Sequence, residues 1–435
     1  MRQKIFLILL LSFSTSYFTH AQEKEIPITL EESVQASLKH NPILKIAEAD
    51  LRMREANVTQ TKAFFLPGLD VSYGGFFTNN PLNAFGFKLQ QEGITQNDFN
   101  PLLLNNPDAT ENYSFKVSFA QPLFNPDLWL KAKAARLALE AETLSAERKK
   151  EFVIYQVKSL YYQVYLTYKS LDVAATYKQT LQEALQQAEA RFKGGYLQQA
   201  DVLKIKAELL QAETEVIAAN KNYEGICDQL SLATGNSLGI LYAPISIEKE
   251  LIGNADSILA NQNRKDFLAM QKALQAQEKI VLAEKNNLLP SLNAFGDWLT
   301  NDNSPTGFGA NAYLAGFQLS WKPFTGLYRS GKIEEEKAKL AKQKEQYQQY
   351  VNNSELERRQ THLLFVQLSQ TELAAKQGAE VAQEIFRITS DRFAQGLTSS
   401  TELLMAGTKG KQQQLNLLYI TTTKLSTIAY QEFLK

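Results

Sequence analysis

The residues that most often carry chemistry are few in this sequence and stand apart from one another. The chain has three histidines, His20, His40 and His362, and none has a Cys, His or carboxylate partner at metal-ligand spacing. Neither His40 nor His362 lies beside a nucleophile motif, and the sequence contains no phosphate-binding loop. Cys227 is the single cysteine, and its apolar neighbours indicate a thiol packed on a helix. We therefore expect no catalytic residue, no metal site and no cofactor.

Acidic residues near the ends of two long helical segments form a second set. Repeated around a symmetry axis, their carboxylates would make negative rings, which favour the passage of cations. Arg387 lies in the same turn as Glu384 and could neutralise it, so a solvent-exposed helix face is the alternative. The candidate ring residues are Glu189, Glu380, Glu384 and Asp391.

The first 21 residues have the composition of a secretory signal peptide. Arg2 and Lys4 precede the apolar run 5–11, and residues 19–21 form a small-residue cleavage site. Serines after this run interrupt it well short of the ~20 residues of a spanning helix. An uncleaved membrane anchor is therefore the less favoured interpretation.

The mature chain is nearly neutral and has no long apolar run. The sequence carries 46 Lys and Arg against 46 Asp and Glu, and loss of Arg2 and Lys4 with the signal peptide leaves a net charge of about −2. This balance gives no support for a nucleic-acid partner. Because no run of 18 apolar residues follows the signal peptide, we expect no transmembrane helix.

The mature sequence repeats itself once. RFKGGYLQQADVLKIKAEL from Arg191 matches RFAQGLTSSTELLMAGTKG from Arg392, and Pro122 and Pro323 share the same offset. Each copy has the order helix, Leu-Pro, strand, loop, strand, Pro, long helix, Gly turn, long helix. The first copy is longer because residues 79–112 extend its hairpin loop, which we interpret as an extracellular elaboration.

The predicted strands alternate between apolar and small or polar residues. Such a period of two suits a barrel strand that faces lipid, although a half-buried soluble hairpin has the same pattern. The apolar positions include Tyr113, Phe115, Val117 and Phe119 in the second strand and Tyr313, Phe317, Leu319 and Trp321 in the fourth, with Val71, Tyr73 and Phe77 in the first.

The predicted helices are unusually long. Apolar residues from Val202 to Leu230 are spaced three and four apart, which is the heptad pattern of a helix seam. No proline interrupts 127–193, which could form one helix of roughly 100 Å at 1.5 Å per residue. Gly194-Gly195 then reads as a helix-to-helix turn.

Four strands cannot close a barrel, and each open edge would leave backbone groups unsatisfied in lipid at several kcal/mol apiece. Other copies of the chain must therefore close it. Two copies give eight strands with a filled interior, whereas three give twelve, which can hold water. A duct therefore needs at least three copies.

Over essentially the whole mature chain, the sequence resembles the TolC family of outer-membrane factors. The resemblance rests on Ile28–Leu69, which looks like the family's opening helix and Leu-Pro-x-Leu step, on a second Leu-Pro-x-Leu at 289–292, and on the two Phe-x-x-Gly turns. It implies a mainly α fold with a small β part, in which long coiled-coil helices form an α-barrel and four transmembrane strands per chain complete a 12-stranded barrel in a homotrimer. It also implies docking to a periplasmic adaptor and to an inner-membrane pump of RND or ABC type.

The expected organisation follows from these patterns. We expect a signal peptide at 1–21, a first repeat at 22–235 with a hairpin at 69–121 and a helical pair at 123–235, an equatorial linker at 236–263, and a second repeat at 264–435 with a hairpin at 291–322 and a helical pair at 326–435.

The resemblance places the Gly turns at the periplasmic tip that meets the adaptor, although the glycines could serve only as helix caps. The expected tip residues are Phe192, Gly195, Tyr196, Leu197, Asp201, Phe393, Gly396, Leu397, Thr398 and Glu402.

The function expected from these features is a non-enzymatic exit duct of an efflux or secretion machine. It would lie in the outer membrane of a Gram-negative bacterium, contact outer-membrane lipid and extend far into the periplasm. A periplasmic coiled-coil adaptor or structural protein is the alternative, since it would share the signal peptide and the heptads but would have soluble strands.

Overall fold

The computed structural model describes residues 25–245, 247 and 263–435 of the 435-residue chain. The predicted signal peptide at 1–21 and most of the predicted linker at 236–263 lie outside the described residues. Among the described helices, none is long and apolar enough to span a membrane.

The chain divides into two compact units, and each unit takes segments from both sequence repeats. Two helices of 68 residues each, α5 (Pro126–Lys193) and α8 (Tyr328–Gln395), contribute to both units, so the repeats and the units do not coincide. Unit 1 comprises Met1–Pro42, Phe152–Ile258 and Arg358–Leu434, and unit 2 comprises Ile43–Glu151, Leu259–Glu357 and Lys435.

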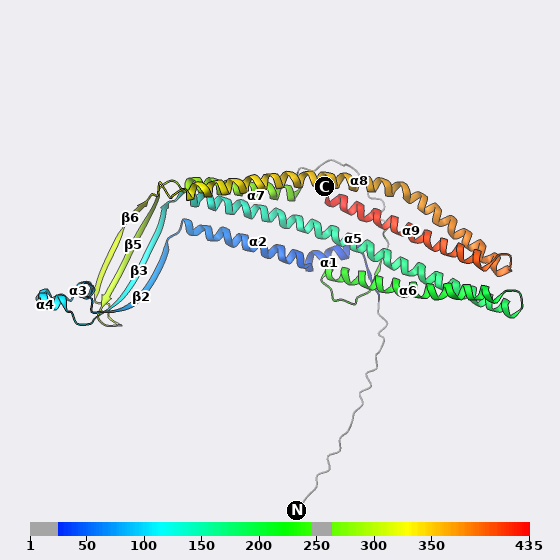
Figure 1. The fold of residues 1–435 in the computed structure, drawn as a ribbon, viewed down its shortest axis with the longest axis horizontal. Helices are drawn as coiled ribbons and strands as arrows, with labels where there is room; N and C mark the ends of the chain where they lie inside the picture. The colour runs from blue at the N-terminus through cyan, green and yellow to red at the C-terminus, as the bar shows by residue number, and fades with distance from the viewer. Residues whose placement is uncertain (1–24, 246, 248–262) are drawn as a thin grey trace, which may run out of the picture. The chain divides into compact units, whose positions relative to one another are not determined.

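Unit 2 contains a four-stranded antiparallel sheet in the order β2-β3-β5-β6 (Figure 1). Pro67 and Pro290 precede the first strand of each hairpin, and Pro122 lies at a register irregularity in β3, where a residue without an N–H is tolerated. The strands expected from the alternating pattern are β2 (Gly68–Thr78), β3 (Thr110–Phe124), β5 (Ser291–Asp302) and β6 (Ala310–Ser320).

One face of the sheet is apolar, because the register keeps like positions of neighbouring strands opposite one another. Val71 lies opposite Val117, and Tyr313 lies opposite Trp298. Val117 and Trp298 also lie opposite each other, so all four side chains share one face. Many apolar side chains on this face are exposed in the single chain, including Leu69, Val71, Tyr73, Phe77, Tyr313, Phe317 and Leu319.

The other face of the sheet is polar, and both outer strands are open. Lys116 of β3 and Asp297 of β5 form an ion pair of 2.9 Å on this polar face. Among the described residues, β2 and β6 each pair with one strand only, so each presents a row of unpaired backbone groups. A sheet with one apolar face, one polar face and two free edges has the pattern expected for a segment of a barrel wall.

The long loop of the first hairpin contains helices, although the sequence predicted only a long loop. Figure 1 shows its helices beyond one end of the sheet. Pro81 and Pro101 each stand at the start of a helix, where the missing N–H costs no hydrogen bond. The elements are α3 (Pro81–Gln90), the 3₁₀ helix η2 (Gln96–Phe99) and α4 (Pro101–Asn105).

Unit 1 is built around the second halves of α5 and α8. The predicted seam of α6 (Gln199–Thr234) is confirmed, with Ile205, Ala212, Tyr223 and Leu230 all buried. Burial raises the pKa of the Cys227 thiol beside this seam. Unit 1 also contains β1 (Ile26–Ile28), which pairs in parallel with β4 (Tyr242–Pro244), and the helices α1 (Leu30–His40) and α9 (Ser400–Phe433).

A buried charge cluster ties together helices of unit 2, namely the first parts of α5 and α8 together with α7 (Lys265–Asn286), whereas α2 (Pro42–Gln60) meets α5 through the separate ion pair of Asp50 and Lys149. Asp266 accepts hydrogen bonds from Arg264 and from the Tyr350 hydroxyl, at 2.9 Å for Tyr350, and its carboxylate lies 3.3 Å from Arg148. Burial alone would raise the pKa of Asp266, but the hydrogen bonds from Arg264 and the charge of Arg148 outweigh it and lower the pKa.

Replacing Asp266 with alanine should destabilise unit 2 by about 3–5 kcal/mol, because two buried guanidinium groups lose a shared counter-charge. The control Asp50→Ala removes a half-exposed pair with Lys149 and should cost less than about 1 kcal/mol. Denaturant unfolding followed by helical circular dichroism measures both.

The same cluster predicts a pH dependence. Since the folded pKa of Asp266 is lowered, its contribution is complete above the ordinary Asp pKa of about 3.9 and is lost as the pH falls through the folded value. The stability difference between wild type and Asp266→Ala should therefore shrink below about pH 4. Equal effects of the two substitutions at neutral pH would contradict this account.

Candidate functional site

The two Gly turns of unit 1 have the same backbone geometry. After α5, Gly195 has φ +78° and the Tyr196 N–H donates to the Arg191 carbonyl at 2.9 Å. After α8, Gly396 has φ +84° and the Leu397 N–H donates to the carbonyl of the residue at the matching position, Arg392, at 2.8 Å. This pattern of a left-handed glycine and a long back-bond caps a helix C-terminus.

Side chains tie the first turn to the second. Nη1 of Arg191 donates to the Phe393 carbonyl at 2.6 Å, and its guanidinium carbon lies 5.7 Å from the centre of the Phe393 ring. The Ser400 hydroxyl donates to Asp201 at 2.6 Å, and this bond is the main cause of the lowered pKa of Asp201. The helix pairs α5–α6 and α8–α9 are thus joined at their turns.

The expected tip residues separate into a buried and an exposed group. Phe393 is 1% exposed and belongs to a core with Ala188, Ile205 and Leu403. Its side chain therefore holds the turns together and offers no surface to a partner. The exposed residues of the expected set include Phe192, Tyr196 and Leu397, of which Tyr196 is 83% exposed.

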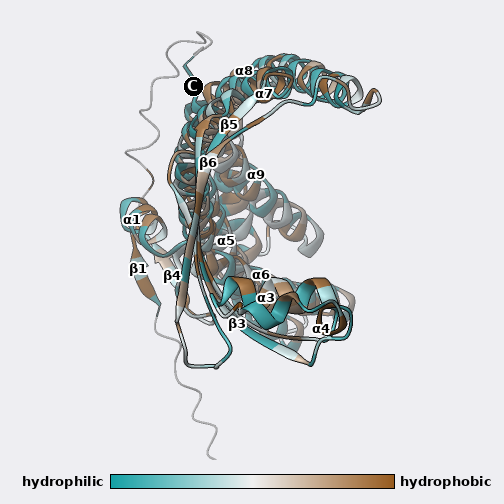
Figure 2. Cartoon of the chain, turned by 90° about the vertical axis from the view of Figure 1, so that its left-hand side faces the viewer, coloured by the Kyte–Doolittle hydropathy of each residue, from teal (hydrophilic) through white to brown (hydrophobic). Residues whose placement is uncertain are grey.

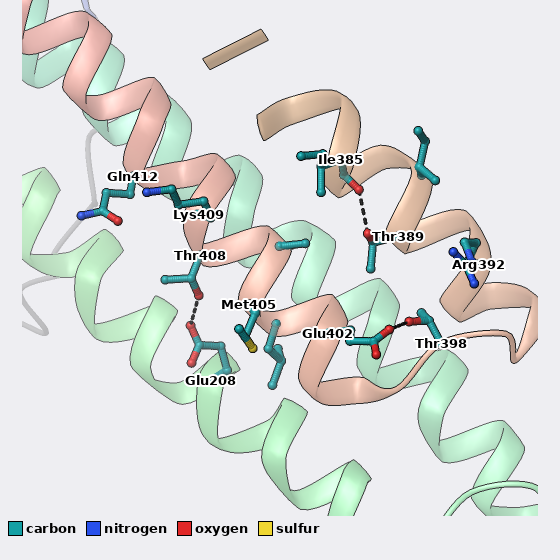
Figure 3. A pocket seen from close by; sticks show the side chains of 13 residues that line it. Glu208, Ile385, Thr389, Arg392, Thr398, Glu402, Met405, Thr408, Lys409 and Gln412 are labelled. Atoms are coloured by element: carbon teal, nitrogen blue, oxygen red, sulfur yellow. Dashed lines mark hydrogen bonds between the residues drawn. The ribbon is translucent and has the colours of Figure 1, made fainter. Parts of the chain in front are cut away.

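A groove of about 810 Å³ lies beside the second turn, between residues of α6, α8 and α9. Figure 3 shows Glu208 of α6 facing Thr408 of α9, and Glu402 facing Thr398, to which it is hydrogen-bonded. Exposed apolar side chains also line the groove, among them Ile385, Ile388 and Met405. The groove therefore combines apolar side chains with charged and hydroxyl groups.

The acidic candidates fall into two groups. Arg387 binds Glu384 through two hydrogen bonds of 2.9 and 2.8 Å and binds Asp391 at 3.0 Å. The hydrogen bonds from Arg387 lower the pKa of Glu384. These three exposed residues form a triad with a formal charge of −1. Glu189 and Glu380 lie on exposed faces of α5 and α8.

A second set of contacts between the two helix pairs, formed by Tyr177, was not predicted from the sequence. The Tyr177 hydroxyl lies 3.0 Å from Glu208 and 3.2 Å from Thr408, and burial raises the Tyr177 pKa. Gly407 permits this packing, because a Cβ there would come within 2.9 Å of Tyr177. No local sequence pattern singled out Tyr177 or its partners from other helices.

Replacing Gly195 or Gly396 with valine should open the hydrogen bonds of its turn. A left-handed backbone costs a residue with a Cβ about 1–2 kcal/mol, which corresponds to amide exchange about 5- to 30-fold faster. The effect should be larger at Gly396, where a Cβ would also meet the Arg191 guanidinium. Peptide-resolved hydrogen exchange across each turn measures it.

The matched control is Gly225→Val in α6, where a Cβ would meet no described atom within 4 Å. It should leave both turns unchanged. Unaltered exchange in both turn variants would show that the left-handed backbone does not limit the substitution.

The model of the Outer membrane efflux protein family matches residues 33–236 and 258–427. No curated protein matches the chain. Among solved structures, the fold is similar to the CmeC outer membrane channel of Campylobacter jejuni (TM-score 0.79, 16% identity, 93% of this chain and 85% of that chain) and to VceC of Vibrio cholerae (TM-score 0.76, 16% identity, 93% and 95%). It is also similar to the MtrE outer membrane channel of Neisseria gonorrhoeae (TM-score 0.72, 15% identity, 93% and 88%).

At these identities the solved structures show the fold alone, whereas the family model covers most of both repeats. The expected mainly α fold, with long helices and a four-stranded sheet, is confirmed. The match also decides against a periplasmic adaptor and confirms a transport protein that catalyses no reaction. The chain belongs to the outer membrane efflux protein family, the TolC family, and is an efflux channel of the Gram-negative outer membrane.

Proposed function

We propose that three copies of this chain close a 12-stranded barrel and form the passive exit duct of a tripartite efflux system. The observation that carries this proposal is the open sheet, whose outer strands β2 and β6 are unpaired among the described residues. In lipid every backbone group needs a partner, so β2 of one copy pairs with β6 of the next. The apolar face then meets lipid and the polar face lines the water-filled duct.

The number of copies follows from the width of the barrel. Eight strands leave an interior that side chains fill, whereas twelve leave room for water and solutes. With four strands per chain, three copies are the smallest number that makes a duct. The transported molecule then crosses the duct without being chemically changed. The candidate site agrees with this, because it consists of helix turns, a groove and exposed carboxylates.

We propose that a periplasmic adaptor docks at the turns, where it would couple the duct to an inner-membrane pump of RND or ABC type. The groove beside the second turn supports this, because exposed Ile388 and Met405 lie beside Arg392, Lys409 and Glu402. An amphipathic helix from the adaptor could bury its apolar side there and pair its charges at the rim. Exposed Tyr196 and Leu397 in the turns would extend the same surface.

We propose that the Glu384, Arg387 and Asp391 triad surrounds the periplasmic entrance. Three copies of a group with formal charge −1 would place a net negative charge on a narrow lumen, where low-dielectric walls strengthen the field. Because Arg387 bonds to both carboxylates, its loss should have the opposite effect to loss of one carboxylate.

Replacing Met405 with glutamate should weaken adaptor binding about 10- to 100-fold, because a charge would be buried in an apolar contact worth roughly 2–3 kcal/mol. The matched control is Leu373→Glu, an equally exposed apolar residue of α8 outside the groove. Binding of the purified channel to a purified periplasmic adaptor of an RND or ABC efflux system from the same organism measures the effect. Equal affinity of the Met405 variant and the wild type would remove the groove from the docking surface.

Cation selectivity in planar bilayers should follow the charge of the triad. Arg387→Gln makes the triad −2 and should increase selectivity and block by a trivalent metal, whereas Glu384→Gln makes it neutral and should decrease both. Glu189→Gln, Glu380→Gln and Asp391→Asn test the remaining candidates. If selectivity and metal block are the same in all five variants, the carboxylates are ordinary solvent-exposed surface.

A further inference from the structure

The long loop of the first hairpin packs against the polar face of the sheet. Phe76 of β2 and Asn112 of β3 lie opposite each other on that face. The Phe87 ring of α3 lies 6.1 Å from the Phe76 ring, and the Gln91 side-chain amide donates to the Asn112 side chain at 2.9 Å and to the Glu111 carbonyl at 2.7 Å. Helix α3 is therefore anchored on the side of the sheet that carries Lys116 and Asp297.

Strand β5 also takes part in the contacts that hold the loop on the sheet. The Asn112 side chain is 2% exposed and donates to the Asn301 side chain of β5 at 3.1 Å. Asn301 lies opposite Ser114 and shares the polar face with Asn112. A chain of amide groups thus fixes the loop to two central strands.

Contacts within residues 79–109, named here the cap, make it a folded element. Lys88 and Asp98 form an ion pair of 2.8 Å, and Asp98 also caps η2 by accepting from Thr95. The rings of Phe85 and Phe99 meet edge to face at 5.7 Å, beside the fully buried Ala84. The cap therefore has its own small core.

The loop of the second hairpin packs on the opposite, apolar face of the sheet. The Tyr73 hydroxyl donates to the Pro305 carbonyl at 2.6 Å, and the Phe308 ring lies 6.0 Å from the Phe115 ring. Tyr73 and Phe115 lie opposite each other on the apolar face. The two hairpins of unit 2 therefore direct their loops to opposite faces of one sheet.

We propose that the cap folds inward over the mouth of the duct and that three copies of it together restrict what can enter from outside. The inference rests on the proposed trimer, in which the polar face lines the lumen. The cap follows edge strand β2, so it stands beside the joint with the next copy, and on the lumen side it meets the other two caps.

The surface of the cap fits contact with its own copies. Leu82 is 79% exposed and Leu102 is 76% exposed, and Leu89 and Phe99 are also exposed. Figure 2 shows apolar residues on both α3 and α4. The charged residues of the cap are Lys88, Glu92, Asp98 and Asp108, and Lys88 is paired with Asp98. A narrow mouth with apolar walls resists the entry of ions and large polar molecules.

The test places a reporter thiol below the cap. Ser72 lies on the polar face of β2, and the natural thiol of Cys227 is fully buried in unit 1. Ser72→Cys is labelled from outside intact cells with a small membrane-impermeant maleimide and with a bulky polyethylene-glycol maleimide. In the cap deletion, Asn-Gly joins Thr78 to Thr110, which are opposite in register, so a two-residue turn fits.

We expect the small reagent to label Ser72→Cys at similar rates with and without the cap, and the bulky reagent to label it slowly in the intact chain and rapidly in the deletion. A milder variant, Gln91→Ala, should raise the rate with the bulky reagent about 5- to 30-fold, the change expected for two lost hydrogen bonds. The control Gln90→Ala, at the exposed neighbouring residue, should leave the rate unchanged.

The possible outcomes distinguish a failure of the cap proposal from a failure of the proposed duct. Equal labelling by the bulky reagent with and without the cap overturns the cap proposal and leaves the duct intact. Absence of labelling by the small reagent in both forms shows that the polar face does not line an open lumen, which overturns the proposed function and the cap together. Native mass measurement of each variant confirms that three copies remain assembled.

Discussion

The need to satisfy backbone hydrogen bonds at the edges of a small sheet governs this structure. Within the described part of the chain, strands β2 and β6 each present unpaired N–H and C=O groups, and in lipid each such group costs several kcal/mol. The apolar face with Val71 and Tyr313 is stable only against lipid, and the polar face with Lys116 and Asp297 only against water. Both conditions are met when other copies of the chain supply the missing strands. In the trimer that we propose, the oligomer is therefore part of the fold, and the single chain is one third of the barrel wall.

A different requirement governs the helix turns, which must end long helices abruptly and still hold two helix pairs together. Gly195 and Gly396 provide the left-handed backbone, while Arg191, Asp201 and Ser400 join the turns through hydrogen bonds and Phe393 through its buried ring. These contacts leave Tyr196, Leu397 and the groove at Met405 exposed. The residues that stabilise the turns therefore differ from the exposed residues of the same short segments, which we propose contact the adaptor.

The sequence predicted regular features better than contacts between distant residues. Three features follow from patterns that span only a few residues each. They are the alternation in 113–119, the seam through Ile205 and Leu230, and the repeated Gly turns. The β1–β4 pair, the Tyr177 contacts and the bond between Asn112 and Asn301 beneath the cap depend on partners far along the chain, and no local pattern encodes them. Phe393 illustrates the limit, because its repeat partner Phe192 is exposed while it is buried.

The closure of the barrel is tested most directly by hydrogen exchange on the detergent-purified protein, combined with native mass measurement. Every second amide of β2 and β6 points away from its neighbour within the chain, so these amides are protected only if another copy pairs with them. The account predicts a mass of three chains and protection of β2 and β6 equal to that of β3 and β5. A stable single chain, or a trimer in which the outward amides of β2 and β6 exchange freely, would contradict it.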